Sequence, residues 1–189
     1  RNFYYINQID VIDSFYSIRE DINRMMYGSY LLELADASVL EEEENVKLFL
    51  LFVKGLKVLS IIDKDFIKLV LSYELKHISF LGYKPLLDSC AICGSKKFND
   101  FRFSINKGGI ICPKCFSLDA NLENMDLDMY KAINLLLYTP LDKLSNIEIS
   151  ERTMFKLHNI MVKYILHKIG RKKFSSLDIL KSLYEYGGD

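Results

Sequence analysis

The chain has 189 residues, of which half are hydrophobic, and its 25 basic residues balance 25 acidic ones. This length and apolar content suffice for one sizeable core or two small ones, which excludes an intrinsically disordered chain. Zero net charge argues against a uniformly basic nucleic-acid-binding protein. The longest uninterrupted apolar run, Leu48 to Val53, is far shorter than the ~18 residues that suggest a membrane span, so no membrane segment is expected.

The first residues predict a β-strand. The segment from Asn2 to Ile9 is rich in β-branched and aromatic residues, which favour strands. A strand is not stable alone and needs further strands or a covering helix. We therefore interpret residues 1–11 as the last strand of a domain that precedes the rest of the chain.

Three helices are expected next, because apolar residues recur at helical spacing. Their predicted N-caps or first residues are Asp13 or Ser14, Asn45 and Asp63. The first of these helices continues toward Leu34. The second, Val46 to Ile62, is apolar on most faces, and we expect it to be buried. Gly82 is placed to end the third.

The composition changes at Pro85. Two cysteine turns flank a strand-like run from Phe98 to Ile105, and the pair Gly108-Gly109 fits a hairpin turn. Residues 85–119 are therefore predicted to form a small β insertion.

Three more helices follow this insertion. Asp126 begins one that stops before Pro140, and Ser150 begins a longer one that ends near Gly170. Ser175 and Asp178 resemble a capping box for the last helix. The expected fold is thus mainly α: a helical bundle of residues 12–84 and 120–189 with an inserted four-cysteine β element that resembles a zinc ribbon.

The four cysteines carry the clearest chemical signal. Cys90 and Cys93 form one C-x-x-C pair, and Cys112 and Cys115 form a second pair after eighteen intervening residues. Each C-x-x-C turn can aim two thiolates at one point, so the two pairs together predict a tetrahedral four-sulfur site for Zn²⁺. With four protein ligands, no coordination position stays open for a substrate, and the metal is expected to be structural.

Other interpretations of the cysteines remain open. Four ordinary buried cysteines or two disulfides would fit the same residues, although the double C-x-x-C spacing favours chelation in a reducing compartment. Iron accepts the same four-thiolate shell. The pattern of zinc deaminases is absent, because no H-x-E or C-x-E partner accompanies the cysteines. Zinc is the prediction.

A second signal is a local excess of positive charge. From Arg152 to Leu177 there are seven basic residues and no acidic one. On a helix, one face would present Arg152, Lys156, Lys163, His167 and Arg171, and Lys172 and Lys173 extend that face. We call its six Lys and Arg residues the basic stripe. It is either a solvated helix face or a surface that attracts phosphates or an acidic peptide.

No catalytic constellation is apparent. The histidines are His77, His158 and His167, each on a predicted helix, and none accompanies a Cys or Ser in a catalytic pattern. The glycines form no nucleotide-binding motif. The run Glu41 to Glu44 reads as a solvated connection. The protein is therefore not expected to be an enzyme.

These motifs together resemble the RecO family of bacterial recombination mediators. The resemblance extends from about Ile12 to the C-terminus. It lies in Ile18-Arg19-Glu20-Asp21, in Leu31 to Leu34, in Leu81-Gly82-Tyr83 with Pro85, in Cys90 to Gly94, in Gly108-Gly109 before Cys112 to Cys115, and in Lys173 to Leu177.

The resemblance implies a non-enzymatic DNA repair protein. It would bind single- and double-stranded DNA, anneal strands, contact RecR and single-strand-binding protein, and help to load RecA at the nucleoid in the bacterial cytoplasm. Family members begin with an OB-fold, of which residues 1–11 would be the last strand, so DNA binding by this chain is expected to be weak. The alternative is a helical zinc-ribbon adaptor that binds only proteins, for instance in transcription.

Overall fold

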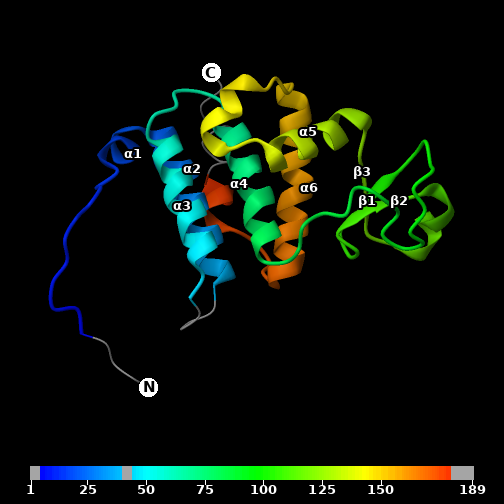
Figure 1. Ribbon diagram of the computed structural model, residues 1–189, viewed down its shortest axis with the longest axis horizontal. Coiled ribbons are helices and arrows are strands. Elements are labelled where there is room, and N and C mark those ends of the chain that lie inside the picture. The colour runs from blue at the N-terminus through cyan, green and yellow to red at the C-terminus, as the bar shows by residue number, and fades with distance from the viewer. Residues whose placement is uncertain (1–4, 40–43, 180–189) are drawn as a thin grey trace.

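The structure, a computed structural model, describes residues 5–39 and 44–179. Long helices pack side by side as a bundle, and a small three-stranded sheet lies at one end of it (Figure 1). Within the described residues, no helix is long and apolar enough to cross a membrane. The elements in chain order are α1 (Tyr16–Glu20), α2 (Ile22–Ser38), α3 (Val46–Leu59), α4 (Phe66–Phe80), β1 (Arg102–Ser104), β2 (Gly109–Ile111), the 3₁₀ helix η1 (Pro113–Leu118), β3 (Leu122–Asn124), α5 (Leu127–Tyr138), the 3₁₀ helix η2 (Leu141–Asn146) and α6 (Glu151–Ile169).

Helix α4 is the centre of the bundle and contacts α2, α3, α5 and α6. It is buried on almost all sides, including the fully buried carboxylate of Glu74. Burying a charge is costly unless it is paired and hydrogen-bonded. Glu74 accepts a hydrogen bond from the Tyr30 hydroxyl at 2.5 Å and lies 3.2 Å from Nδ1 of His158. This network joins α2, α4 and α6.

The expectation that the second predicted helix would be buried all round is wrong. Helix α3 lies at the edge of the bundle and buries only the face that packs against α2 and α4 (Figure 1). Val46, Phe49 and Leu50 on its other face are exposed. An apolar outer face cannot be distinguished from a core face by periodicity, since both consist of the same residue types.

The first predicted helix is interrupted. Its N-terminal turns form α1, the chain extends at Asp21, and α2 begins directly after it. The Asp21 carboxylate accepts a hydrogen bond from the backbone N–H of Arg24 at 2.8 Å and so caps α2. Asp13 instead accepts from the N–H of Phe15 before α1.

The predicted strand at Asn2 to Ile9 is not seen in its described part. From Tyr5 to Ile9 the chain has no regular secondary structure and its side chains are exposed, while residues 2–4 lie outside the described residues. A strand requires a partner strand for its backbone hydrogen bonds, and within the described residues Tyr5 to Ile9 has none. The interpretation of residues 1–11 as the end of a preceding domain stays a prediction.

Several predicted helix ends are confirmed. The side chains of Asn45, Asp126 and Ser150 each accept a hydrogen bond from a backbone N–H in the first turn of α3, α5 and α6. Gly170 ends α6 with a positive φ of 69°. Of the predicted run Glu41 to Glu44, only Glu44 is described, and it is exposed.

The predicted capping box of the last helix is wrong. Residues 175–179 are helical, but the N–H groups of Ser175 and Ser176 donate to the carboxylate of Glu33 on α2, both at 2.8 Å. Asp178 pairs with Lys173 at 3.2 Å instead. A cap supplied by another helix has no local sequence pattern.

The sheet is antiparallel in the order β2-β1-β3. The strand-like run predicted from Phe98 shortens to β1, and β3 had no counterpart in the sequence analysis. Phe103 in β1 pairs with Ile110 in β2 and with Glu123 in β3. We call residues 85–124 the cysteine ribbon.

Candidate metal centre and the surfaces beside it

The two C-x-x-C turns bring all four sulfur atoms together. The Sγ atoms of Cys90, Cys93, Cys112 and Cys115 lie within 4.8 Å of one another, and the distances from Cys112 Sγ to those of Cys93 and Cys115 are both 3.8 Å. Thiolates about 2.3 Å from a tetrahedral ion are about 3.8 Å apart, whereas a disulfide requires about 2.0 Å. The four sulfurs therefore lie close enough together to hold a metal ion, and the two distances of 3.8 Å match those around a tetrahedral metal.

Local backbone hydrogen bonds explain this convergence. The Cys90 carbonyl accepts from the N–H of Gly94 at 2.9 Å, where a positive φ of 71° closes the first turn. The N–H of Cys115 donates to the Cys112 carbonyl at 2.9 Å in the second turn. The N–H of Ala91 donates to Ile110 O at 2.8 Å and joins the first turn to β2.

The environment of the sulfurs favours thiolates unequally. Burial raises the pKa of the Cys90 thiol, but backbone N–H groups, including those of Cys93 and Cys112, outweigh burial and lower that pKa to about 6. Burial and the neighbouring sulfurs raise the pKa of Cys115 to about 12. Metal binding displaces the thiol protons. The positive charge of a bound cation would then offset the repulsion between the thiolates. The donor set therefore suits a soft or borderline cation that holds structure.

Two glycines make close contacts at the hairpin turn of the cysteine ribbon, Gly108 with Tyr164 of α6 and Gly109 with Leu86 of the ribbon itself. The hairpin turn predicted at Gly108-Gly109 is confirmed, and it packs against Leu86 and Tyr164. A Cβ on Gly109 would lie 2.5 Å from the Leu86 carbonyl oxygen, and a Cβ on Gly108 would collide with the Tyr164 hydroxyl. Leu86 hydrogen-bonds both sides of this turn, through Gly108 O and the N–H of Ile110, each at 2.9 Å.

Asp119 holds the inside of the hairpin. This buried carboxylate accepts hydrogen bonds from Ser104 Oγ, from Asn106 Nδ2 at 2.7 Å and from the N–H of Asn121 at 2.9 Å. Burial raises its pKa, but these donors outweigh burial and lower it. The structural role of Asp119 could not be recognised from the sequence, since an isolated aspartate in a turn-rich segment usually lies in solvent.

The basic stripe points outward, as the helical projection predicted. All six of its residues are exposed, while Leu157, Met161 and Tyr164 on the opposite side of α6 are buried. Three of the six already face carboxylates. Lys163 lies 2.6 Å from Glu123, Lys156 lies 4.0 Å from Asp126, and Lys173 contacts Asp178.

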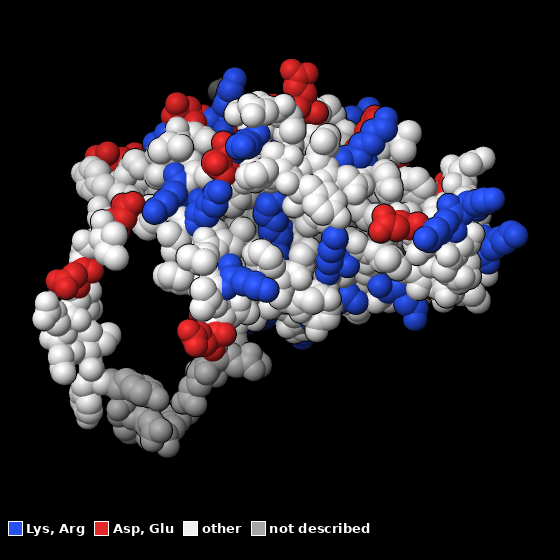
Figure 2. Space-filling model, viewed as in Figure 1, with Lys and Arg blue, Asp and Glu red and all other residues white. Residues whose placement is uncertain are grey.

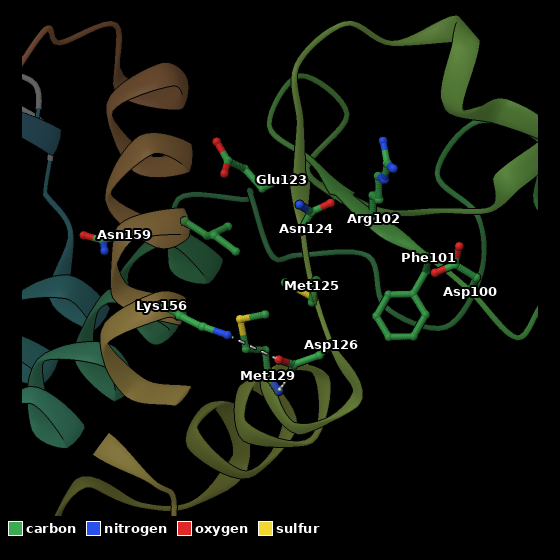
Figure 3. A pocket seen from close by; sticks show the side chains of 11 residues that line it. Asp100, Phe101, Arg102, Glu123, Asn124, Met125, Asp126, Met129, Lys156 and Asn159 are labelled. Carbon is green, nitrogen blue, oxygen red and sulfur yellow. Dashed lines mark hydrogen bonds and ion pairs between the residues drawn. The ribbon is translucent and has the colours of Figure 1, made fainter. Parts of the chain in front are cut away.

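A cleft of about 590 Å³ separates the cysteine ribbon from α6 (Figure 3). Lys156 extends from α6 toward Asp126 at the start of α5, and Glu123 and Asn124 line the cleft from β3. Arg102 lines the cleft from β1. Acidic and basic side chains thus both line the cleft. The positive charge of this part of the stripe is therefore partly neutralised within the protein.

The histidines form no catalytic group with a Ser or Cys in the described residues. His77 is fully buried, and burial lowers its pKa to about 4. Within the described residues, neither of its ring nitrogens has a hydrogen-bond partner. His158 contacts Glu74, and His167 is exposed.

The fold and the site define a helical bundle protein with an inserted four-cysteine ribbon and a candidate metal centre. The profile of the family described as "Recombination protein O C terminal" matches residues 19–178. The chain belongs to the RecO family of DNA repair proteins.

Curated relatives agree with this assignment. The chain is 31% identical over 183 residues to the "DNA repair protein RecO" of Acetivibrio thermocellus and also 31% identical over 183 residues to that of Alkaliphilus metalliredigens. These alignments cover 97% of this chain and 72% and 74% of the relatives. It is 34% identical over 150 residues to the protein of that name in Listeria monocytogenes, which covers 78% of this chain and 57% of the relative.

Proposed function

We propose that the chain is part of a non-enzymatic recombination mediator that binds DNA, anneals complementary strands and, with RecR and single-strand-binding protein, helps to load RecA. The observation that carries this proposal is the family match over residues 19–178. The closed arrangement of four cysteines supports a role without catalysis, because a metal held by four protein ligands offers no position to a substrate.

We further propose that the metal is Zn²⁺ and that it is structural. Four thiolates at tetrahedral spacing are typical of zinc sites that stabilise small folds. The cysteine ribbon has three strands of three residues each, which is too little to be stable without a further contribution. Zinc bound by Cys90, Cys93, Cys112 and Cys115 would supply that contribution.

Strand annealing tests the mediator function. We expect the chain to accelerate pairing of complementary oligonucleotides coated with single-strand-binding protein, without any nucleotide cofactor, in a fluorescence-quenching assay. Binding should weaken as salt rises, because phosphate contacts release counterions. If neither single- nor double-stranded DNA is bound at low salt, the protein-only adaptor is the better description.

The basic stripe is proposed as one electrostatic surface of this mediator. Replacing Lys163 and Arg171 by Gln should weaken binding of DNA or of an acidic peptide, while circular dichroism and metal content stay unchanged. Each lost phosphate contact should reduce the steepness of log K against log salt by about 0.7 on a single strand or about 0.9 on a duplex. Replacing Lys57 and Lys64 by Gln, both exposed and lying on α3 and in the connection after it, is the control. Unchanged binding of both ligands would leave the stripe as a solvated helix face.

A further inference from the structure

Three lysines outside the basic stripe gather beside exposed tyrosines. Lys168 Nζ on α6 lies 5.9 Å from the ring centroid of Tyr83, and it donates a hydrogen bond to the carbonyl of Asn106 at 2.8 Å. Asn106 is the neighbour of Lys107 in the hairpin turn. We call Tyr83, Lys84, Lys107, Tyr138 and Lys168 the tyrosine–lysine patch.

The other end of the patch repeats this pairing. Lys84 Nζ lies 4.9 Å from the ring centroid of Tyr138 and donates a hydrogen bond to the Tyr138 hydroxyl at 2.8 Å. The patch therefore spans the hairpin turn, α6, the connection after α4 and the end of α5. Figure 2 shows several Lys or Arg side chains over the C-terminal end of α4 and the area beside it, with no acidic side chain between them.

The cations of the patch lack carboxylate partners. In the described part of the chain, Lys84, Lys107 and Lys168 form no ion pair, unlike Lys156 and Lys163 of the stripe. The charge of Lys107 helps to lower the pKa of Asp119, but that carboxylate is buried and already accepts three hydrogen bonds.

The proximity of two of these lysines is unfavourable without an anion. Burial lowers the pKa of Lys168, and the positive charge of Lys107 lowers it further. Like charges that face each other without a counter-ion repel. An anionic ligand between these ammonium groups would relieve that repulsion.

The backbone of Tyr83 is held by hydrogen bonds, and the side chains of both tyrosines are exposed. Gly82, with a positive φ of 87°, ends α4 and turns the chain. The backbone of Tyr83 is fixed by its N–H donating to Ile78 O at 2.9 Å and by its carbonyl accepting from the Tyr164 hydroxyl at 2.8 Å. Tyr83 is nevertheless 44% exposed, and Tyr138 is 67% exposed.

We infer that the tyrosine–lysine patch binds a short single strand of nucleic acid, with bases stacked on Tyr83 and Tyr138 and phosphates at Lys84, Lys107 and Lys168. Sequence-tolerant single-strand sites combine aromatic faces with cations that follow the backbone. An acidic peptide would satisfy the lysines, but it would make no use of the exposed aromatic surface of Tyr83 and Tyr138. The inference rests on the proposed DNA-binding function and adds a surface distinct from the basic stripe.

The test compares two labelled oligonucleotides of twelve units in fluorescence anisotropy. One is oligothymidine and the other has the same phosphate backbone without bases. Tyr83→Ala should weaken binding of oligothymidine about five- to a hundredfold, the usual value of one stacked base, and should leave the abasic strand unaffected. Tyr83→Phe keeps the ring and should bind as the unmodified chain does.

The charge of the patch is tested separately. The double variant Lys84→Gln with Lys107→Gln should weaken binding of both oligonucleotides and reduce the steepness of log K against log salt by about 1.4, for two single-strand contacts. Lys168 is left in place because it donates to Asn106. Tyr16→Ala is the matched control. Tyr16 lies on α1, away from the patch, and is a 60% exposed tyrosine beside Arg19.

Three outcomes would overturn the inference. One is unchanged oligothymidine binding by Tyr83→Ala in a chain that otherwise binds DNA. The second is an equal loss for the oligothymidine and the abasic strand, which would indicate a general distortion. The third is that the lysine double variant binds an acidic peptide more weakly but binds both oligonucleotides as before, which would make the patch a peptide-docking surface. If the unmodified chain binds no DNA at all, the proposed function fails as well, and these cases are thereby distinguished.

Discussion

Gly109 is a point of close approach between two segments of the cysteine ribbon. Its Cα approaches the backbone of Leu86 so closely that any side chain would contact the Leu86 carbonyl oxygen. Backbone atoms cannot rotate away as a side-chain end can, and the strand hydrogen bonds on both sides of Gly109 prevent a shift. The position is therefore fixed by contact rather than by backbone conformation, because Gly109 does not have a positive φ.

Gly109→Ala should destabilise the protein more than Gly82→Ala. The first substitution forces β2 away from Leu86 and should cost roughly 1–3 kcal/mol, as overpacking does. The second meets nothing within 4 Å and carries only the strain of a positive φ, about 1 kcal/mol. Urea denaturation of the two variants at one metal concentration measures the difference. Equal losses would show that the close approach to Leu86 does not matter.

His77 makes the stability of the bundle depend on pH. Its pKa is lowered to about 4 by burial, below the ordinary value of 6.5. The unfolded chain therefore takes up a proton before the folded one does. The stabilising contribution is complete above pH 6.5 and decreases as the pH falls toward 4, with a slope of up to about 1.4 kcal/mol per pH unit.

His77→Phe should remove this dependence. The phenyl ring has a similar size and no proton to bind, so the variant should lose less stability than the unmodified chain between pH 6.5 and pH 4. Thermal unfolding of both proteins across this range measures the difference, and release of metal by acid affects both alike. Parallel curves would mean that His77 takes up its proton at the same pH in the folded and the unfolded chain.

At the scale of elements, we expect the stability of the cysteine ribbon to depend on a bound metal and that of the helices not to. Around its cysteines the ribbon buries Ile111 and few other apolar residues, whereas Phe103, Ile105 and Ile110 of the ribbon join the large core that the helices form. Structural zinc sites contribute apparent binding free energies of about 10–16 kcal/mol. Removing the metal should therefore unfold the ribbon and leave the bundle intact.

Elemental analysis and hydrogen exchange test this separation. We expect one zinc per chain, and after chelation we expect fast amide exchange in residues 85–124 with protection retained in α4. Cys90→Ser should have the same effect as chelation. Iron in place of zinc, or a metal-free protein with a fully protected ribbon, would refute the assignment.

The sequence predicted the elements that rest on local chemistry. The caps at Asn45, Asp126 and Ser150, the turn at Gly108-Gly109 and the two C-x-x-C turns involve only neighbours along the chain, and all of them form. What could not be predicted depends on distant partners. Neither the cap of Ser175 by Glu33 nor the ion pair of Lys163 with Glu123 has any pattern in the residues around it.

The same distinction explains the surfaces. The basic stripe was found because its residues share one helix, and its partial neutralisation was missed because Glu123 and Asp126 lie elsewhere in the chain. The tyrosine–lysine patch was not found because its five residues come from four separate segments. A search for tyrosines adjacent to lysines would have returned Tyr130-Lys131 and Lys163-Tyr164 as well as Tyr83-Lys84, so it would not have singled out the patch.

For the whole molecule, the proposed preceding domain has a measurable consequence. If residues 1–11 complete an OB-fold, a longer chain that includes the preceding residues should bind single-stranded DNA much more tightly than this chain, because OB-folds bind single strands through a groove and stacking aromatics. Anisotropy titrations of both chains at one salt concentration decide this. Equal affinities would show that the bundle and the cysteine ribbon provide the main DNA surface.

The contact of Glu33 with Ser175 and Ser176 also bears on the order of folding during synthesis. It joins residues more than 140 positions apart in the chain, and α4 is likewise enclosed only once α6 is in place. Contacts of such long sequence separation form late, because the loop between them must be closed first. The cysteine ribbon, whose pairings span residues 86–124, can form on the ribosome while the helices before it still await their partners. The cysteine ribbon can thus form before α5 and α6 are synthesised, and the bundle beside it is completed only when those helices follow.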